Sequence, residues 1–311
     1  MTTMDDEVHM ATVTTRSDEA STATQVVTFE GVAKIFQAPD GGDVAAVQDL
    51  SFSVNTGELV ALVGQTGCGK STAFNLLLGL FPPTAGEVRV QGRDPHHEFE
   101  ALKGRVAVVF QDDRLLPWRS AEDNVALGLE YAGVPKAERR EIAREWLGRL
   151  GLAGREDAYP YQLSGGMRQR VGIARCFALD PEIILCDESF SALDELTADQ
   201  LRQEFTDLVV QQHKTGVFIT HSIEEALTMG DRVLVFRAPG HVSAEIEVPD
   251  HLDTDGLARH RTLVRQAMTG EITGRGHRLS ASTTRRPGPR ARPRRDDRWP
   301  EPGPFHERCQ R

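Results

Sequence analysis

A glycine-rich segment has the residue types and spacing of a loop that binds phosphate. It lies between an apolar run, 58–63, that predicts a strand and a stretch from 70 to about 80 that predicts a helix. Glycines let the backbone curl until several N–H groups face phosphate oxygens, and the start of the helix adds positive potential. An ordinary glycine turn is the alternative, but it would not explain the flanking strand and helix. The segment reads Gly64, Gln65, Thr66, Gly67, Cys68, Gly69, Lys70, Ser71 and Thr72.

Two side chains in this segment fit the charge of a nucleoside triphosphate. Lys70 would place an ammonium group at the β- and γ-phosphates, and Ser71 would offer a hydroxyl to Mg²⁺. The segment by itself indicates a nucleoside triphosphate and nothing narrower.

A second motif is an apolar run, 183–186, that ends in the acids Asp187 and Glu188. The run predicts a buried strand. Asp187 at its tip can join the shell of a Mg²⁺ ion, and Glu188 can polarise a water molecule. Taken alone, the segment fits a strand that ends in a solvated acidic turn equally well.

A third motif is the run Ser164, Gly165 and Gly166 before a predicted helix, 168–179. A serine followed by two glycines gives a helix start that can bind an anion. The alternative is an ordinary capped helix, but the position shortly before the run into Asp187 argues against it.

The elements that carry these motifs predict an α/β fold. Short apolar strands at 58–63, 106–110, 183–186 and 217–220 alternate with helices, which favours a mainly parallel sheet covered on its faces. Helical residues at 122–158 interrupt that alternation and indicate a separate helical subdomain. Two strands, 232–236 and 244–248, flank a turn at 238–240, and a last helix is predicted at about 254–269.

Composition and charge exclude several classes of protein. The 311 residues are 39% apolar with 28 glycines, which excludes a mainly disordered or fibrous chain. No apolar run is long enough to cross a bilayer, no secretory signal is visible, and the four cysteines show no disulfide or zinc spacing. The cytoplasm is therefore the expected compartment.

The charge is unevenly distributed along the chain. Residues 275–311 hold 11 Arg against 4 Asp or Glu, a balance of +7, so a net charge of −10 leaves −17 on the remainder. An acidic body argues against nucleic acid as a partner. We expect residues 1–24 to be a disordered leader and residues 271–311 a disordered basic tail. Attraction of that tail to anionic lipid head groups is the alternative.

The motifs and their order resemble the ATP-binding subunit of ABC transporters, over about 26–248. The resemblance rests on the glycine-rich loop, Gln111 after a strand, the Leu-Ser-Gly-Gly-Met run, the Asp187–Glu188 pair, the run 191–194 and His221, in that order. It implies a P-loop NTPase core with a small antiparallel β subdomain and a helical signature subdomain at about 112–165, within an ATPase domain at 25–270.

The resemblance also implies roles for single residues, with ATP and Mg²⁺ as cofactors. Phe36 resembles the aromatic that stacks on adenine, with a packed core phenylalanine as the alternative. Gln111 matches the glutamine that senses Mg²⁺ and the γ-phosphate, Glu188 the general base, and His221 the histidine that holds the γ-phosphate and the attacking water. The Ser164–Gly166 run would contact ATP on a partner subunit, and Asp194 would lie at that interface.

Three positions depart from the usual pattern or invite a further expectation. Thr66 replaces a serine but keeps the hydroxyl. Ser189 replaces the usual proline after the base, and the loss of a rigid φ is expected to loosen Glu188 slightly. Cys68 lies at a helix start and is expected to be a reactive thiol.

The segment after Gln111 is similar to that of the nitrate, sulfonate and taurine importer subgroup. Leu115, Leu116 and Trp118 form an apolar cluster that we expect to be an exposed docking surface for the coupling helix of a permease. Packing of Trp118 inside the helical insert is the alternative. The subgroup also serves bicarbonate and pyrimidine-type vitamin precursors, so the solute stays open.

The resemblance thus implies an ATPase at the cytoplasmic face of the membrane. Its expected partners are transmembrane permease subunits, a second ATPase subunit in a homodimer, and indirectly a periplasmic or lipoprotein solute-binding protein. Two rivals are a soluble non-transport ABC ATPase and a P-loop kinase. The first would carry long coiled coils or two tandem cassettes, and the second would lack the Ser164–Gly166 run.

Overall fold

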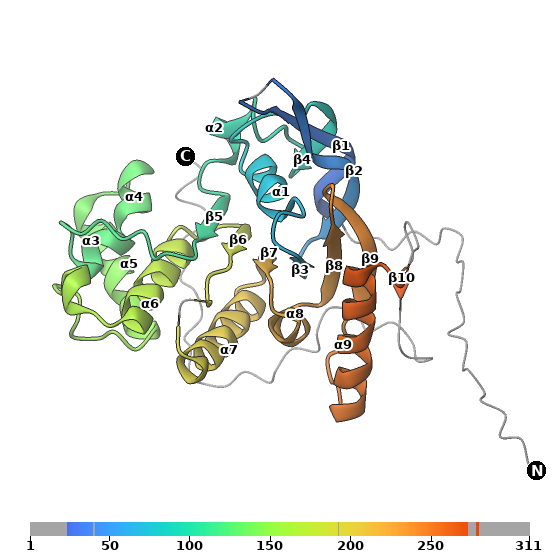
Figure 1. Ribbon diagram of the computed structural model, residues 1–311. Helices are drawn as coiled ribbons and strands as arrows, with labels where there is room; N and C mark the ends of the chain where they lie inside the picture. Colours follow the sequence, from blue (N-terminus) through green and yellow to red (C-terminus); the bar gives the residue numbers. More distant parts are fainter. Residues whose placement is uncertain (1–23, 40, 192, 273–277, 280–311) are drawn as a thin grey trace, which may run out of the picture.

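The computed structural model describes residues 24–39, 41–191, 193–272 and 278–279. Strands and helices alternate along most of this length (Figure 1). The strands are β1 Gln25–Gln37, β2 Asp43–Asn55, β3 Leu59–Gly64, β4 Ala85–Val90, β5 Val106–Val109, β6 Ile183–Asp187, β7 Thr215–Thr220, β8 Arg232–Arg237, β9 His241–Glu247 and β10 Arg278–Leu279. The helices are α1 Lys70–Leu77, α2 Phe99–Leu102, α3 Ala121–Val125, α4 Leu127–Tyr131, α5 Lys136–Arg149, the 3₁₀ helix η1 Pro160–Gln162, α6 Gly165–Ala178, α7 Glu195–Gln211, α8 Ile223–Met229 and α9 Thr254–Thr269.

The described strands form two sheets. The larger has the order β10-β9-β8-β3-β7-β6-β5, and its pairs are parallel except for the antiparallel hairpin of β8 and β9. The smaller has the order β2-β1-β4 and is antiparallel. The carboxyl ends of β3, β5, β6 and β7 therefore meet at one edge of the larger sheet, the place where α/β proteins bind ligands.

Strand β3 shows how the larger sheet is buried on both faces. Leu59, Ala61 and Val63 contribute to one apolar cluster, whereas Val60 and Leu62 contribute to another. Successive side chains of a strand point to opposite faces, so a wholly apolar strand needs cover on both. This explains why all six residues of β3 are buried.

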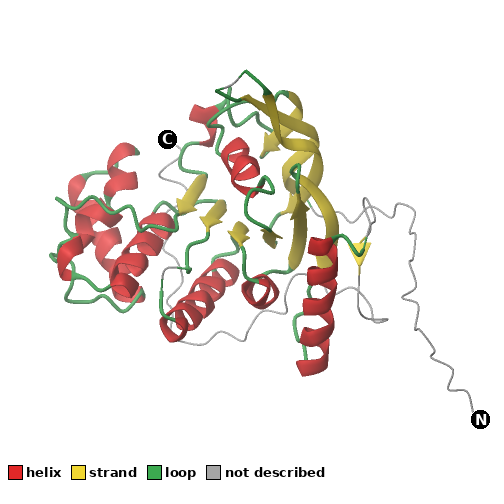
Figure 2. Ribbon diagram, in the orientation of Figure 1, coloured by secondary structure: helices red, strands yellow, loops and turns green. Residues whose placement is uncertain are grey.

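The two apolar clusters correspond to two layers around the larger sheet (Figure 2). Helix α1 and the small antiparallel sheet share one cluster, and helices α6, α7, α8 and α9 contribute to the other. Helices α3, α4 and α5 lie to one side of the sheet, at the left of Figure 1, and contact it through α6.

The expected fold class is confirmed, with small differences at element ends. The first helix ends at Leu77 rather than near 80, because Gly79 follows in a left-handed conformation with φ 67°. The hairpin around 238–240 and the last helix are confirmed. The domain boundaries remain a prediction. Except for residue 24, the leader lies outside the described residues. Of the basic tail, only 271–272 and the backbone of 278–279 lie inside them.

Across the described part of the chain, no helix combines the length and apolar character that a membrane crossing requires.

Candidate active site

The glycine-rich loop joins β3 to α1, as the sequence predicts. Gly67 and Gly69 have φ of 78° and 101°, values that side chains other than glycine rarely adopt. Gly69 is the residue before the first turn of α1, and no side chain caps that turn by a hydrogen bond. The backbone N–H groups of the first turn are therefore directed at the mouth of the loop, as an anion site requires.

Lys70 folds its side chain back onto this loop. Its Nζ donates to the carbonyl oxygens of Gly64, at 2.7 Å, and of Gln65, at 3.0 Å. Only 6% of the residue is exposed. The ammonium charge is thus held at the centre of the loop by two backbone acceptors, where it can meet phosphate oxygens.

The end of the loop is enclosed by two distant segments. A Cβ on Gly69 would lie 2.6 Å from the carbonyl oxygen of Ala46 in β2 and 2.8 Å from the Cα of Gly240 in the β8–β9 turn. The N–H of Gln48 in β2 donates to the carbonyl oxygen of Gly240, and this hydrogen bond joins the same two segments. Position 69 therefore requires glycine for both its backbone angles and its close neighbours.

The expected reactivity of Cys68 is wrong. Its side chain is 3% exposed and belongs to the apolar cluster under the small sheet. Its sulfur lies 3.8 Å from Nζ of Lys70, on the inner side of the loop. A thiol reagent cannot reach it without opening the fold.

Asp187, Glu188 and His221 meet at the carboxyl ends of β6 and β7. The Nδ1 of His221 lies 3.5 Å from the Oε2 of Glu188, and the histidine side chain is 61% exposed. Glu188 has φ 45°, a left-handed conformation for a residue with a long side chain, and its N–H donates to the carbonyl of Ile219. The carboxylate and the imidazole are thus brought together from neighbouring strands.

Asp187 lies between opposing charges at this edge. Burial raises its pKa, and the adjacent carboxylate of Glu188 raises it further, whereas Arg114 and Lys70 act to lower it. The influence of Lys70 on Asp187 connects the acidic strand end to the glycine-rich loop. A cation at this position would favour the ionised form of Asp187.

Ser189, which is expected from the sequence to loosen Glu188 slightly, has a buried hydrogen-bond partner of its own. The serine is 3% exposed, and its hydroxyl donates to the carbonyl oxygen of Val109 at 2.8 Å. At position 189 the serine therefore links the end of β6 to the end of β5 by a hydrogen bond, whereas a proline there would only restrict φ.

Gln111 follows β5 and contacts the same strand end through a serine. Its Nε2 donates to the Oγ of Ser191 at 3.3 Å, and Ser191 donates in turn to the carbonyl oxygen of Glu188 at 2.9 Å. The predicted sensor and the predicted base are therefore linked by one intervening hydroxyl.

Three side chains of α6 hold the segment that follows β5, and the sequence motifs did not predict this role for them. Arg168 binds the carboxylate of Asp113 at 2.8 Å, and Gln169 donates to the carbonyl of Phe110 at 3.2 Å. Arg175 donates to the carbonyls of Asp113 and Arg114. The residue types offered no signal, because each partner is a backbone or side-chain atom more than 50 positions away.

The Ser164–Gly166 run forms the start of α6. The Oγ of Ser164 accepts from the N–H of Met167 at 3.3 Å, and Ser164 and Gly165 are exposed. A Cβ on Gly166 would lie 2.9 Å from Thr197 in α7, next to Asp194, which caps that helix. The run is on the surface, so a second molecule can reach it.

Phe36 is not a core residue. It is 39% exposed in β1, and its ring meets Phe81 edge-on at 5.4 Å between centroids. The ammonium group of Lys34 lies over both rings. An exposed aromatic at this position is free to stack on a planar ligand.

The predicted apolar docking cluster is only partly exposed. Trp118 is 71% exposed, but Leu115 is 8% exposed and belongs to the main apolar cluster. Leu116 is half-buried, and its N–H donates to the buried side chain of Asn124. Inclusion of Leu115 in an exposed surface is therefore wrong, because the chain turns it inward against the helical group formed by α3, α4 and α5.

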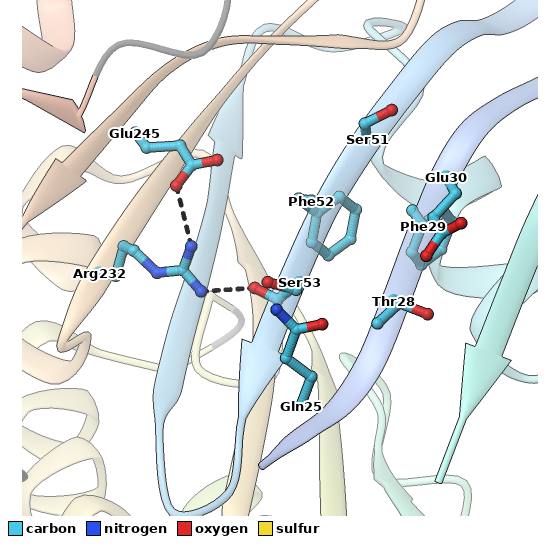
Figure 3. A pocket seen from close by; sticks show the side chains of 9 residues that line it. All are labelled: Gln25, Thr28, Phe29, Glu30, Ser51, Phe52, Ser53, Arg232 and Glu245. Atoms are coloured by element: carbon cyan, nitrogen blue, oxygen red, sulfur yellow. Dashed lines mark hydrogen bonds and ion pairs between the residues drawn. The ribbon is translucent and has the colours of Figure 1, made fainter. Parts of the chain in front are cut away.

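A hollow of about 290 Å³ is lined by none of these residues but by side chains of β1 and β2, together with Arg232 of β8 and Glu245 of β9 (Figure 3). Arg232 at its side is bound by Glu58, Glu245 and the carbonyl of Ser53. Every group on this guanidinium already has an acceptor, so the arginine serves to join β8 to its neighbours rather than to hold a ligand.

Comparison with known proteins agrees with this geometry. Residues 47–191 match the ABC transporter family. An uncharacterized ABC transporter ATP-binding protein of Methanocaldococcus jannaschii is 44% identical over 223 residues, 70% of this chain and 80% of that protein. The taurine import ATP-binding protein TauB of Escherichia coli K12 is 43% identical over 204 residues, 65% of this chain and 78% of TauB. TauB of Rhizobium johnstonii is 45% identical over 68% of this chain and 80% of its own length.

Comparison with solved structures indicates the same family. The ATP-binding cassette MJ0796, in a dimeric post-hydrolysis state bound to ADP and Pi, aligns with a TM-score of 0.63 at 32% identity, over 72% of this chain and 99% of that one. The chain belongs to the ABC transporter family and is an ABC-type ATPase. It is the ATP-binding subunit of an ABC transporter and is related to the taurine import proteins.

Proposed function

We propose that this ATPase energises an importer for a small solute of the nitrate, sulfonate or taurine type, at the cytoplasmic face of a membrane. The observation that carries the hydrolytic part is the 3.5 Å approach of His221 to Glu188 at the strand ends beside the glycine-rich loop. The names of the relatives, which are 43–45% identical, support a taurine-like solute. Bicarbonate or a vitamin precursor is the alternative within the same class.

The donor atoms at the loop suit Mg²⁺. Within the described residues no group of three His, Cys, Asp or Glu side chains could hold a metal alone. Ser71 and Asp187, with Gln111 nearby, offer only hard oxygen ligands and too few of them for a closed site. Mg²⁺ is commonly bound in this way, by one or two protein oxygens together with substrate phosphates. When bound, Mg²⁺ would neutralise charge on the phosphates.

Each group of the protein would have a separate role in ATP hydrolysis. The backbone N–H groups of the loop and Lys70 would bind the phosphates of ATP, and Phe36 would stack on adenine. Glu188 would take a proton from water as the water oxygen bonds to the γ-phosphorus and the bond to the ADP oxygen breaks. His221 would hold the water and the γ-phosphate, and Gln111 would report their presence to the segment 112–119.

A second copy of the chain would complete each site. Ser164 and Gly165 are exposed and Gly166 is half-buried, so the start of α6 is open to a second molecule. We therefore infer a homodimer in which this run contacts ATP bound to the partner's loop, with Asp194 at the interface. The dimeric state of MJ0796 supports the arrangement.

A membrane partner would dock on the side of the helical group. Trp118 is a large apolar side chain left 71% exposed in the segment that follows Gln111. Aromatic anchors of this kind dominate the energy of many interfaces. The partner we propose is the coupling helix of a permease, which in turn would meet a solute-binding protein.

The test of the catalytic assignment is a Glu188→Gln variant with Lys70→Ala as its contrast. Glu188→Gln should still bind ATP but lose turnover, because the amide cannot accept the proton, and should accumulate as an ATP-bound dimer in size-exclusion chromatography. Lys70→Ala should lose ATP affinity instead. Normal turnover by Glu188→Gln would refute the assignment. Reconstitution with the permease and uptake of labelled taurine against nitrate would test the solute.

A further inference from the structure

The buried hydroxyl of Ser189 points to a positioning role in catalysis. We propose that Ser189, through its hydrogen bond to Val109, fixes the carboxylate of Glu188 relative to the segment that carries Gln111. The inference rests on the proposed role of Glu188 as the general base.

The hydrogen bond fixes the end of β6 relative to the end of β5. Ser189 directly follows Glu188, and its Oγ donates 2.8 Å to the carbonyl oxygen of Val109, the last residue of β5. Gln111 is two residues further along the chain. A shift of either strand end would therefore move the base and the sensor relative to each other.

Burial makes this hydrogen bond costly to break. Ser189 is 3% exposed, so water cannot easily replace the lost partner. A bond of this kind holds its groups more rigidly than an exposed one, because the alternative is an unsatisfied hydroxyl in the interior.

Glu188 itself needs such restraint. Its φ of 45° lies in the left-handed region, which is unfavourable for residues with a Cβ and persists only where the surroundings impose it. Three hydrogen bonds act on its main chain: its N–H donates to the carbonyl of Ile219, and its carbonyl accepts from both the N–H and the Oγ of Ser191. Ser189 adds a further restraint on the residue's carboxyl side, and it reaches the strand on the other side of β6.

A proline at position 189 would work differently. It would restrict φ at 189 but could donate nothing to Val109. This chain therefore has a link from the base to β5 that a proline cannot provide.

Ser189→Ala tests the proposal, with Ser243→Ala as the matched control. Ser243 is also buried, at 8% exposure, and its Oγ donates to the carbonyls of Val235 and Ala267. It lies in β9, which β8, β3 and β7 separate from β6 in the larger sheet. We expect Ser189→Ala to lower the kcat of ATP hydrolysis about tenfold or more, with KM for ATP changed less than about twofold, because the base is misplaced and the phosphate loop is not. Ser243→Ala should lose similar stability and keep its kcat.

Further variants make the result decisive. In a Glu188→Gln background, Ser189→Ala should cause no additional loss of the residual rate, since Ser189 acts through the carboxylate. If Ser189→Ala does not fold, Ser189→Cys, which keeps the size and weakens the donor, takes its place in the same measurements. A wild-type kcat in either variant, or equal kcat losses in Ser189→Ala and Ser243→Ala, overturns the proposal. If Glu188→Gln hydrolyses ATP normally, the proposed base is wrong instead, so the two failures are distinguishable.

Discussion

The guanidinium of Arg175, near the end of α6, donates a hydrogen bond of 2.7 Å to the main-chain carbonyl of Asp113. Ser164 caps the start of the same helix, and Asp113 lies two residues after Gln111. Burial lowers the pKa of Arg175, and its guanidinium donates to the backbone carbonyls of Asp113 and Arg114. The segment that would sense ATP in one subunit is thus fastened to the helix that would meet ATP in the other.

Replacing Arg175 should separate these two elements. In Arg175→Met the two carbonyl bonds are lost, at roughly 1.5–3 kcal/mol for a hydrogen bond to a charged group. We expect faster amide hydrogen exchange at 111–116 and a lower kcat with unchanged ATP affinity. Arg139→Met is the control, since Arg139 donates to the carbonyl of Val134 within the helical group. Unchanged exchange at 111–116 would contradict the fastening.

Alanine substitutions at Trp118 and Leu115 should distinguish a role in permease docking from a role in fold stability. Trp118→Ala should leave the melting temperature nearly unchanged and weaken assembly with the permease by about thirtyfold, for an anchor of about 2 kcal/mol. Leu115→Ala should instead lower the free energy of unfolding by about 2–5 kcal/mol, because Leu115 is in the core. Calorimetry and a binding assay on both variants give the comparison. A large fall in melting temperature for Trp118→Ala would remove the docking assignment.

Glu225 gives the fold a dependence on pH. Burial raises the pKa of Glu225, and the nearby carboxylate of Glu188 raises it further. The hydrogen bond from Thr220 and the charges of Arg202 and His221 act to lower this pKa, but the net shift is upward. Because the folded-state pKa is raised, the stabilising contribution of protonated Glu225 is complete below the unfolded pKa and is lost as pH rises through the folded one. The melting temperature of Glu225→Gln should therefore increase relative to wild type as pH rises from acid to neutral. A difference that is independent of pH would show that Glu225 does not titrate in this way.

Local motifs in this chain could be predicted because their chemistry fixes their spacing. The loop from Gly64 to Thr72 must curl around phosphate, and the apolar run before Asp187 must be a buried strand, so both are visible without a structure. Leu115 and Trp118 are apolar neighbours three residues apart, and only the path of the chain decides which one turns inward. The bond from Ser189 to Val109 joins residues 80 positions apart, so no local pattern could indicate it.

The tight packing of Gly69 against Ala46 and Gly240 sets an order on folding during synthesis. The phosphate loop has its complete wall only when β2, which comes before it, and the β8–β9 turn, which comes about 170 residues later, have both joined it. Contacts between such distant residues carry a loop-closure cost, and during synthesis they cannot form before the later segment has been made. A nascent chain that has reached His221 already contains every motif named above, yet it still lacks Gly240. Nucleotide binding should therefore begin only after the β8–β9 hairpin has left the ribosome, and retention of ribosome-bound chains of increasing length on immobilised ATP would reveal that threshold.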